Sequence, residues 1–179
     1  WSSDVCSSDL IFSHGQESGP WGGKITAMAA MVRELGAHAD SVDYQGIADP
    51  TQRVQKLVGV LGGIDPRERS VILVGSSMGG HVATAACHFR PVDGVFVLAP
   101  AYYMPGYEEL TPPPPECPLE IVHGWRDDVV PVENSIRFAR ESLASLHVVD
   151  GDHRLTENID IINELLRLFI ARVATDRGE

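Results

Sequence analysis

Short apolar runs alternate with longer amphipathic stretches along the whole chain. The apolar runs have the length and composition of buried strands, and they cover residues 10–13, 41–44, 71–74, 94–98, 119–122 and 146–149. The stretches between them carry apolar residues at helical spacing, over residues 22–35, 49–61, 81–89, 131–146 and 156–173. Alternating strands and helices favour a parallel sheet joined by right-handed crossovers. The pattern therefore predicts an α/β protein with a mostly parallel sheet of about six strands.

Two of the predicted helices carry recognisable start signals. Asp49 followed by Pro50 is typical of an N-cap and first turn, and Gly62 ends the same segment. Thr156 is the candidate N-cap of the closing helix, whose broad apolar stripe is expected to pack on the sheet.

The apolar run at 71–74 leads into the most specific motif of the chain, Gly75-Ser76-Ser77-Met78-Gly79. This is a G-x-S-x-G pattern between a predicted strand and a predicted helix, the arrangement of a nucleophile elbow. Small residues flank the serine because the turn is too tight for side chains there. The glycine spacing favours Ser77 over its neighbour Ser76 as the nucleophile.

A serine hydroxyl needs a base to accept its proton and an acid to orient that base. In elbow-bearing hydrolases these partners follow in the order serine, acid, histidine. Asp127 lies in a loop after the predicted strand 119–122, and His153 lies just beyond the strand 146–149. The spacing favours Asp127 as the acid, but Asp128 beside it remains an alternative.

Taken together, these motifs resemble those of the small single-domain α/β-hydrolases of the serine esterase type. The similarity extends over nearly the whole chain from Leu10, and its four motifs are the G-x-S-x-G elbow, His123-Gly124-x-x-Asp127-x-x-Val130-Pro131, Gly151-Asp152-His153, and the first loop His14-Gly15-Gln16-Glu17-Ser18-Gly19-Pro20. The resemblance implies a three-layer α/β-hydrolase fold with helices on both faces. It also implies that the first strand lies between the second and the third.

The resemblance further implies a role for each matching residue. Ser77 would attack the substrate, His153 would act as base and then acid, and Asp127 would orient His153. The backbone N–H groups of Met78 and Gln16 would form the oxyanion hole. We interpret His14 and His123, which precede glycines, as residues that shape their loops.

The substrate side is less specified. Many relatives insert a helical lid where this chain has only residues 99–118, so we expect a minimal lid and small or medium acyl groups. Tyr102 and Tyr103 form an aromatic wall beside Ser77 in one interpretation, whereas in the other this segment is only a rigid connector. Trp125, in the acid loop, either lines the pocket or packs against it.

Composition limits the classes of binding partner and the cellular compartments that we expect for this protein. A net charge of −11 over 179 residues argues against nucleic acid, and no apolar stretch is long enough for a bilayer. Three cysteines form no even disulfide framework and no signal peptide is evident, which favours the cytoplasm. The histidines and cysteines lack metal-ligand spacing, so we expect no metal and no other cofactor.

Residues 1–10 read WSSDVCSSDL, a near-repeat of Ser-Ser-Asp. This segment looks like the translation of a synthetic sequencing adapter, so we expect it to be non-native. We expect residues 11–179 to form one α/β-hydrolase domain.

The sequence thus predicts a serine hydrolase, in the first place a carboxylesterase that acts on a small-molecule ester through an acyl-enzyme intermediate. A thioesterase, lactonase or amidase with the same triad remains an alternative. So does a hydrolase-like protein that binds a ligand or a protein partner.

Overall fold

The computed structural model describes residues 8–177, and Cys6 with the rest of residues 1–7 lies outside this range. Six parallel strands form one sheet in the order β2-β1-β3-β4-β5-β6. The strands are β1 (Ser8–Ser13), β2 (His38–Val42), β3 (Ser70–Ser76), β4 (Gly94–Leu98), β5 (Leu119–Gly124) and β6 (Ser145–Val149). The expected sheet of about six strands is confirmed.

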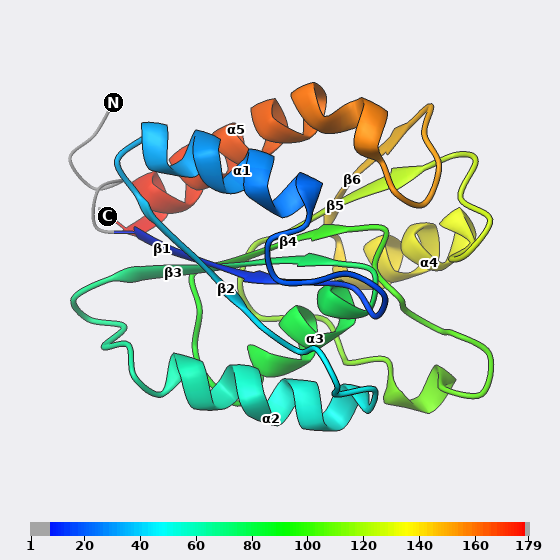
Figure 1. Cartoon of the computed structure of the whole chain (residues 1–179), viewed down its shortest axis with the longest axis horizontal. Coiled ribbons are helices and arrows are strands. Elements are labelled where there is room, and N and C mark those ends of the chain that lie inside the picture. Colours follow the sequence, from blue (N-terminus) through cyan, green and yellow to red (C-terminus); the bar gives the residue numbers. More distant parts are fainter. Residues whose placement is uncertain (1–7, 178–179) are drawn as a thin grey trace.

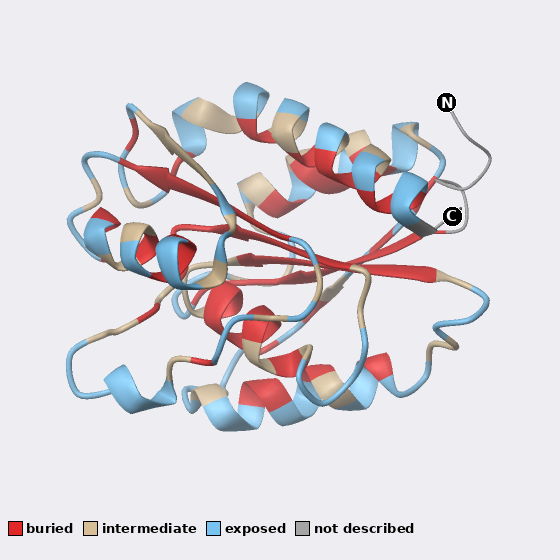
Figure 2. Ribbon diagram, turned by 180° about the vertical axis from the view of Figure 1, so that it is seen from behind, coloured by how far each residue is buried: buried red, intermediate tan, exposed pale blue. Residues whose placement is uncertain are grey.

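Five α-helices cover the two faces of this sheet (Figure 1). Helices α1 (Gly23–Glu34) and α5 (Ile159–Arg177) pack on one face. Helices α2 (Pro50–Leu61), α3 (Met78–Ala86) and α4 (Val132–Ser142) pack on the other. The inner strands β1, β3, β4 and β5 are buried almost throughout, and so is helix α3, whereas the other four helices expose their outer sides (Figure 2). The result is the three-layer arrangement that the sequence pattern predicts.

Strand β1 lies between β2 and β3, as the resemblance implies. The chain leaves β1 toward β2 and leaves β3 toward β4, so the connections diverge at this point. In open parallel sheets such a switch point leaves a crevice at the carboxyl ends of the strands. The loop after β1 and the turn after β3 meet at this crevice.

Element boundaries agree with the sequence in α2 and differ in three other helices, of which α3 spans Met78–Ala86 rather than residues 81–89. The Asp49 side chain accepts hydrogen bonds from the backbone N–H groups of Thr51 and Gln52, which confirms the cap of α2. Helix α4 ends at Ser142 rather than 146 because Leu143 takes a left-handed conformation with φ 56°. Thr156 is not the N-cap of α5, since a separate 3-10 turn occupies Thr156–Asn158.

The first described residues belong to the sheet. Asp9 is buried in β1, where it pairs with His38 and Arg69. These contacts do not test the origin of residues 1–10, which stays a prediction. None of the helices within residues 8–177 combines the length and the apolar character that crossing a bilayer requires.

Candidate functional site

Ser77 lies in the tight turn between β3 and α3. Ser77 has φ 56° and ψ −122°, a strained conformation for a residue with a side chain. The turn is possible because Gly79 carries no side chain: a Cβ there would lie 1.9 Å from the carbonyl oxygen of Ser13. Ser77 therefore projects from the carboxyl end of β3 as the motif predicts.

Three distant segments converge on this serine. His153 Nε2 lies 3.1 Å from Ser77 Oγ, and His153 Nδ1 lies 2.7 Å from Asp127 Oδ2. The side chain of Asp127 is fully buried, while that of His153 remains partly exposed. An alcohol, an imidazole and a buried carboxylate in line can activate the alcohol as a nucleophile.

The buried carboxylate of Asp127 has hydrogen-bond donors at both oxygens. Oδ1 accepts the backbone N–H groups of Val129 and Val130, at 2.9 and 2.8 Å. Burial by itself would raise the pKa of Asp127. The hydrogen bonds from His153, Val130 and Val129 outweigh burial and hold this pKa below its usual value. The carboxylate thus remains charged beside His153 at neutral pH.

A second histidine supports the same carboxylate from the inside of the protein. His123 Nε2 lies 3.0 Å from Asp127 Oδ2 and 3.0 Å from the carbonyl oxygen of Val130. Its Nδ1 lies 2.7 Å from Ser135 Oγ on α4. Burial lowers the pKa of His123, so the ring is neutral and donates from Nε2. The expected loop-shaping role of His123 is confirmed and is specific: it holds the acid loop.

The acid loop and the histidine loop are packed directly against each other. A Cβ on Gly124 would lie 2.2 Å from the carbonyl oxygen of Gly151, so only glycine allows this approach. The backbone N–H of Arg126 donates to the same carbonyl oxygen at 2.9 Å. This close packing fixes the spacing between Asp127 and His153.

The first loop lies against the serine from the other side. A Cβ on Gly15 would be 3.5 Å from the Cβ of Ser77. Next to it, buried His14 accepts the backbone N–H of Tyr44 through Nε2, at 2.8 Å, which confirms its loop-shaping role. Gln16 is exposed in this loop, and Met78 begins α3, where the first N–H groups lack intrahelical acceptors.

The structure separates each candidate from its neighbour. Asp128 is exposed, whereas Asp127 contacts His153. Ser76 Oγ accepts a hydrogen bond from Lys24 and Ser77 Oγ contacts His153. The preferred residue of each pair is thus the one that the spacing indicates.

The expected aromatic wall is wrong for Tyr102. Its ring is fully buried and stacks on Phe138 with centroids 4.0 Å apart, and its hydroxyl lies 2.6 Å from Thr84 Oγ1. A ring with no exposed surface has none to offer a substrate. Tyr103 instead faces α4, where its hydroxyl donates to Glu141.

Trp125 is 59% exposed in the acid loop, and its contact with a substrate stays a prediction. Within residues 8–177 no group of three or more His, Cys, Asp or Glu side chains has the arrangement of a metal site.

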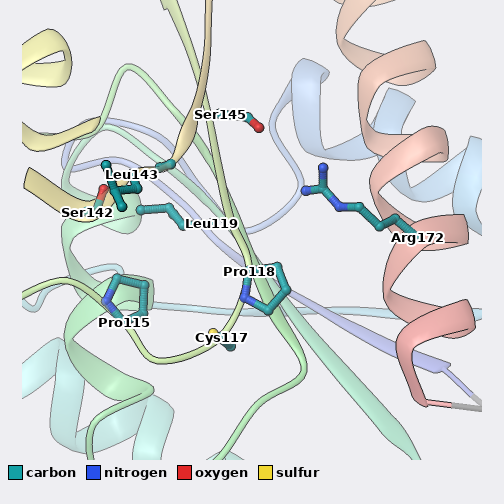
Figure 3. A pocket seen from close by; sticks show the side chains of 9 residues that line it. Pro115, Cys117, Pro118, Leu119, Ser142, Leu143, Ser145 and Arg172 are labelled. Atoms are coloured by element: carbon teal, nitrogen blue, oxygen red, sulfur yellow. The ribbon is translucent and has the colours of Figure 1, made fainter. Parts of the chain in front are cut away.

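A cavity of about 260 Å³ lies away from these residues. Its lining includes Leu119 and Ser145, the first residues of β5 and β6, with Leu143 and Arg172 nearby (Figure 3). Asp127 and His153 follow the opposite ends of the same parallel strands. This cavity therefore lies at the amino ends of the strands, and it is not part of the serine site at their carboxyl ends.

Sequence reasoning missed one side chain beside the site, Lys24 in the first turn of α1. A lone lysine in an amphipathic helix gives no signal of a long-range contact. The acceptor, Ser76, is 52 residues away, and only the folded chain brings the two together.

Comparison with known proteins supports the fold and identifies the family. The mouse mitochondrial palmitoyl-protein thioesterase ABHD10 is 28% identical over 85% of this chain and 71% of its own length. Its solved structure superposes with a TM-score of 0.80 at 21% identity, over 92% of this chain and 90% of that one. A protein of the alpha/beta hydrolase superfamily from Xanthomonas campestris superposes with a TM-score of 0.78 at 27% identity, over 94% and 98% of the two chains. Residues 10–173 match the model of the alpha/beta hydrolase family, and the chain belongs to that family.

Proposed function

We propose that this protein is a serine hydrolase that cleaves carboxylic esters of small or medium acyl groups through an acyl-enzyme intermediate. One observation carries the proposal: the unbroken line from Ser77 Oγ through the His153 ring to the Asp127 carboxylate, at 3.1 and 2.7 Å. Family membership makes a hydrolase the expected activity, and the line of contacts supplies the nucleophile and its base.

In the proposed reaction, Asp127 accepts the Nδ1–H of His153 and so leaves Nε2 free to accept a proton. Ser77 Oγ attacks the ester carbonyl carbon while Nε2 takes its proton. The backbone N–H groups of Met78 and Gln16 stabilise the oxygen of the tetrahedral intermediate. As that intermediate collapses, His153 gives the proton to the departing alcohol and Ser77 carries the acyl group.

Deacylation repeats these steps with water. His153 Nε2 removes a proton from the water molecule as it attacks the acyl carbonyl. The second intermediate collapses, Ser77 regains its proton from His153, and the carboxylic acid leaves. Apart from the substrate and water, the proposed steps use only groups of the chain, so the proposal needs no cofactor.

A thioesterase is the second candidate because the relatives that match include palmitoyl-protein thioesterases from mouse and cow. The same triad cleaves thioesters, and the leaving group is chosen by the pocket. The two candidates differ in acyl length, since a palmitoyl chain needs a long apolar channel. The connector of residues 99–118 favours the shorter chains, because its regular structure is limited to a 3-10 turn at Glu108–Leu110.

The test combines active-site labelling with two matched substrate series. We expect a fluorophosphonate probe to modify Ser77 and to leave Ser76 unmodified, as read by peptide mass spectrometry. Aryl esters and acyl-coenzyme A thioesters from two to sixteen carbons then give kcat/KM for each leaving group. We expect the highest values among esters of two to eight carbons; a maximum at the sixteen-carbon thioester would replace this proposal by the second one.

The variant Ser77→Ala is the decisive control for both candidates. It is expected to lower kcat on the order of 10⁶-fold, by analogy with triad deletions in other serine hydrolases. Its melting temperature should not fall, because alanine keeps the backbone conformation and the substitution removes only the hydroxyl group of Ser77. If well-folded wild-type protein neither reacts with the probe nor turns over any member of the two series, a ligand-binding role is the better account.

We propose a small-molecule ester-like substrate and a cytoplasmic setting. The free thiols of Cys87 and Cys117 support a reducing compartment.

A further inference from the structure

Lys24 contacts the nucleophile turn, and the proposed reaction does not use it. It is the second residue of α1, just after the first loop. Its Nζ donates a hydrogen bond to Ser76 Oγ at 3.1 Å, and Ser76 directly precedes the nucleophile. The ammonium group of the half-buried Lys24 thus contacts the residue directly before Ser77.

This position is costly for a lysine. A positive charge in the first turn opposes the helix dipole, and α1 has no acidic residue there to compensate. Burial lowers the pKa of Lys24 to about 8, although the nearby carboxylates of Asp152 and Asp127 act to raise it. Neither helix formation nor packing explains why a charged side chain occupies this place. The hydrogen bond to Ser76 does supply a reason.

The contact links two segments that must cooperate. The first loop carries Gln16 and continues into α1, whereas Met78 belongs to the turn after β3. Each segment supplies one of the proposed oxyanion donors. The loop already approaches the turn at Gly15, where an added Cβ would lie 3.5 Å from the Cβ of Ser77. The Lys24–Ser76 hydrogen bond fastens the two segments on the side where α1 begins.

We propose that Lys24 is a positioning residue of the esterase site: by holding Ser76, it fixes α1 and the first loop against the nucleophile turn and so keeps the two oxyanion donors at their working separation. This inference rests on the proposed function for its kinetic consequence. Its structural consequence, a change at both loops when Lys24 is replaced, does not depend on any substrate.

The inference predicts a pH dependence. Protonated Lys24 makes a charge-assisted hydrogen bond, which is stronger than that of a neutral amine. The charged groups that face it are the carboxylates of Asp152, in the histidine loop, and Asp127, in the acid loop. Loss of the proton near pH 8 weakens the attachment to Ser76 and removes the attraction to both acids. Activity should therefore decline above about pH 8.

The kinetic experiment compares four variants with wild type between pH 6 and 10. Lys24→Met removes the charge and the donor, Lys24→Arg keeps both, and Ser76→Ala removes the acceptor. Lys56→Met is the matched control, because Lys56 is exposed on α2 and binds only a backbone carbonyl, that of Asp43. The chain contains no other lysine.

We expect Lys24→Met and Ser76→Ala to lower kcat at pH 7 by ~10-fold, the worth of one hydrogen bond, with KM changed less than twofold. Lys24→Arg should keep kcat within about threefold and lose the decline above pH 8, since arginine stays protonated. The melting temperature of Lys24→Met should equal or exceed that of wild type, because a buried charge has been removed. Equal kcat and equal pH profiles in Lys24→Met and Lys56→Met would overturn the inference.

A spectroscopic readout separates this inference from the proposed function. Backbone amide spectra of Lys24→Met should show shifted Gln16 and Met78 signals, while those of Lys56→Met should not. Protein with ¹³C-labelled lysine gives two side-chain signals, of which that of Lys24 should titrate near pH 8. Unchanged Gln16 and Met78 amide signals in Lys24→Met contradict the inference. Absence of ester turnover and of probe labelling in wild type contradicts the proposed function instead.

Discussion

Replacing Asp127 by asparagine tests the proposed mechanism at one atom. Oδ1 accepts two backbone N–H groups, from Val129 and Val130, at 2.9 and 2.8 Å. An amide NH₂ cannot take that place, because donors would then face donors. The asparagine oxygen must remain at the Oδ1 position, so its NH₂ group must occupy the Oδ2 position, 2.7 Å from His153 Nδ1. The Nε2–H of His123, which also faces Oδ2, can then donate to the carbonyl oxygen of Val130 at 3.0 Å instead.

This orientation forces the wrong tautomer on His153. A donor facing Nδ1 requires Nδ1 to be unprotonated, which moves the ring proton to Nε2. Nε2 then points an N–H at Ser77 Oγ, 3.1 Å away, and cannot accept the serine proton. The same change in a serine protease lowers kcat about 10⁴-fold, which corresponds to about 5 kcal/mol of lost transition-state stabilisation. We expect a loss of this size here.

The assay is steady-state hydrolysis of a short aryl ester at pH 7, with the melting temperature measured in parallel. Asp128→Asn is the matched control, because this neighbour is exposed and carries the same chemical change. We expect it to retain kcat within about twofold, as is usual for a surface substitution. A loss confined to Asp128→Asn, or an Asp127→Asn enzyme within tenfold of wild type, would refute the assignment of the acid and the tautomer argument with it.

Two further predictions concern stability. Gly79→Ala should lower the free energy of unfolding by about 3 kcal/mol or more, because its Cβ would collide with the backbone of β1; Gly59→Ala, in open space on α2, should raise it by about 0.5–1 kcal/mol. Urea unfolding measures both, and equal effects would contradict the packing argument. Burial lowers the pKa values of three histidines, His14, His81 and His123. Below about pH 6.5 these histidines bind more protons in the unfolded chain than in the folded one, so the free energy of unfolding should also fall there. Asp127 adds a further loss below about pH 4, since its folded pKa is also depressed. Thermal melts from pH 8 to 2 check both losses, and a melting temperature that rises toward pH 5 would be the contrary result.

The sequence predicted correctly those features that depend on interactions between residues close together in the chain. Asp49 caps α2 as predicted because its hydrogen bonds reach only to Thr51 and Gln52. The end of α4 was not predictable in the same way. Leu143 adopts a left-handed conformation that its side chain does not favour, so that the chain can turn into β6.

Tyr102 shows the same limit at the site. An aromatic residue close in sequence to the nucleophile strand is equally able to line a pocket or to fill the core. The choice was made by Phe138 and Thr84, which offer a stacking partner and a hydrogen-bond partner from α4 and α3. Neither contact leaves a trace in the local sequence around Tyr102.

By itself the sequence determined the strand and helix order and the place of the turn after β3, because glycine spacing and apolar periodicity report local backbone geometry. It also predicted Ser77, Asp127 and His153 as the triad, with Asp128 left as an alternative acid. Only the tertiary structure decided that His123 and two backbone N–H groups hold the acid, that Tyr102 is core, and that Lys24 reaches Ser76. Those contacts join segments brought together by the order of the strands in the sheet. A chain encodes such contacts in the shape of its whole core rather than in any short motif.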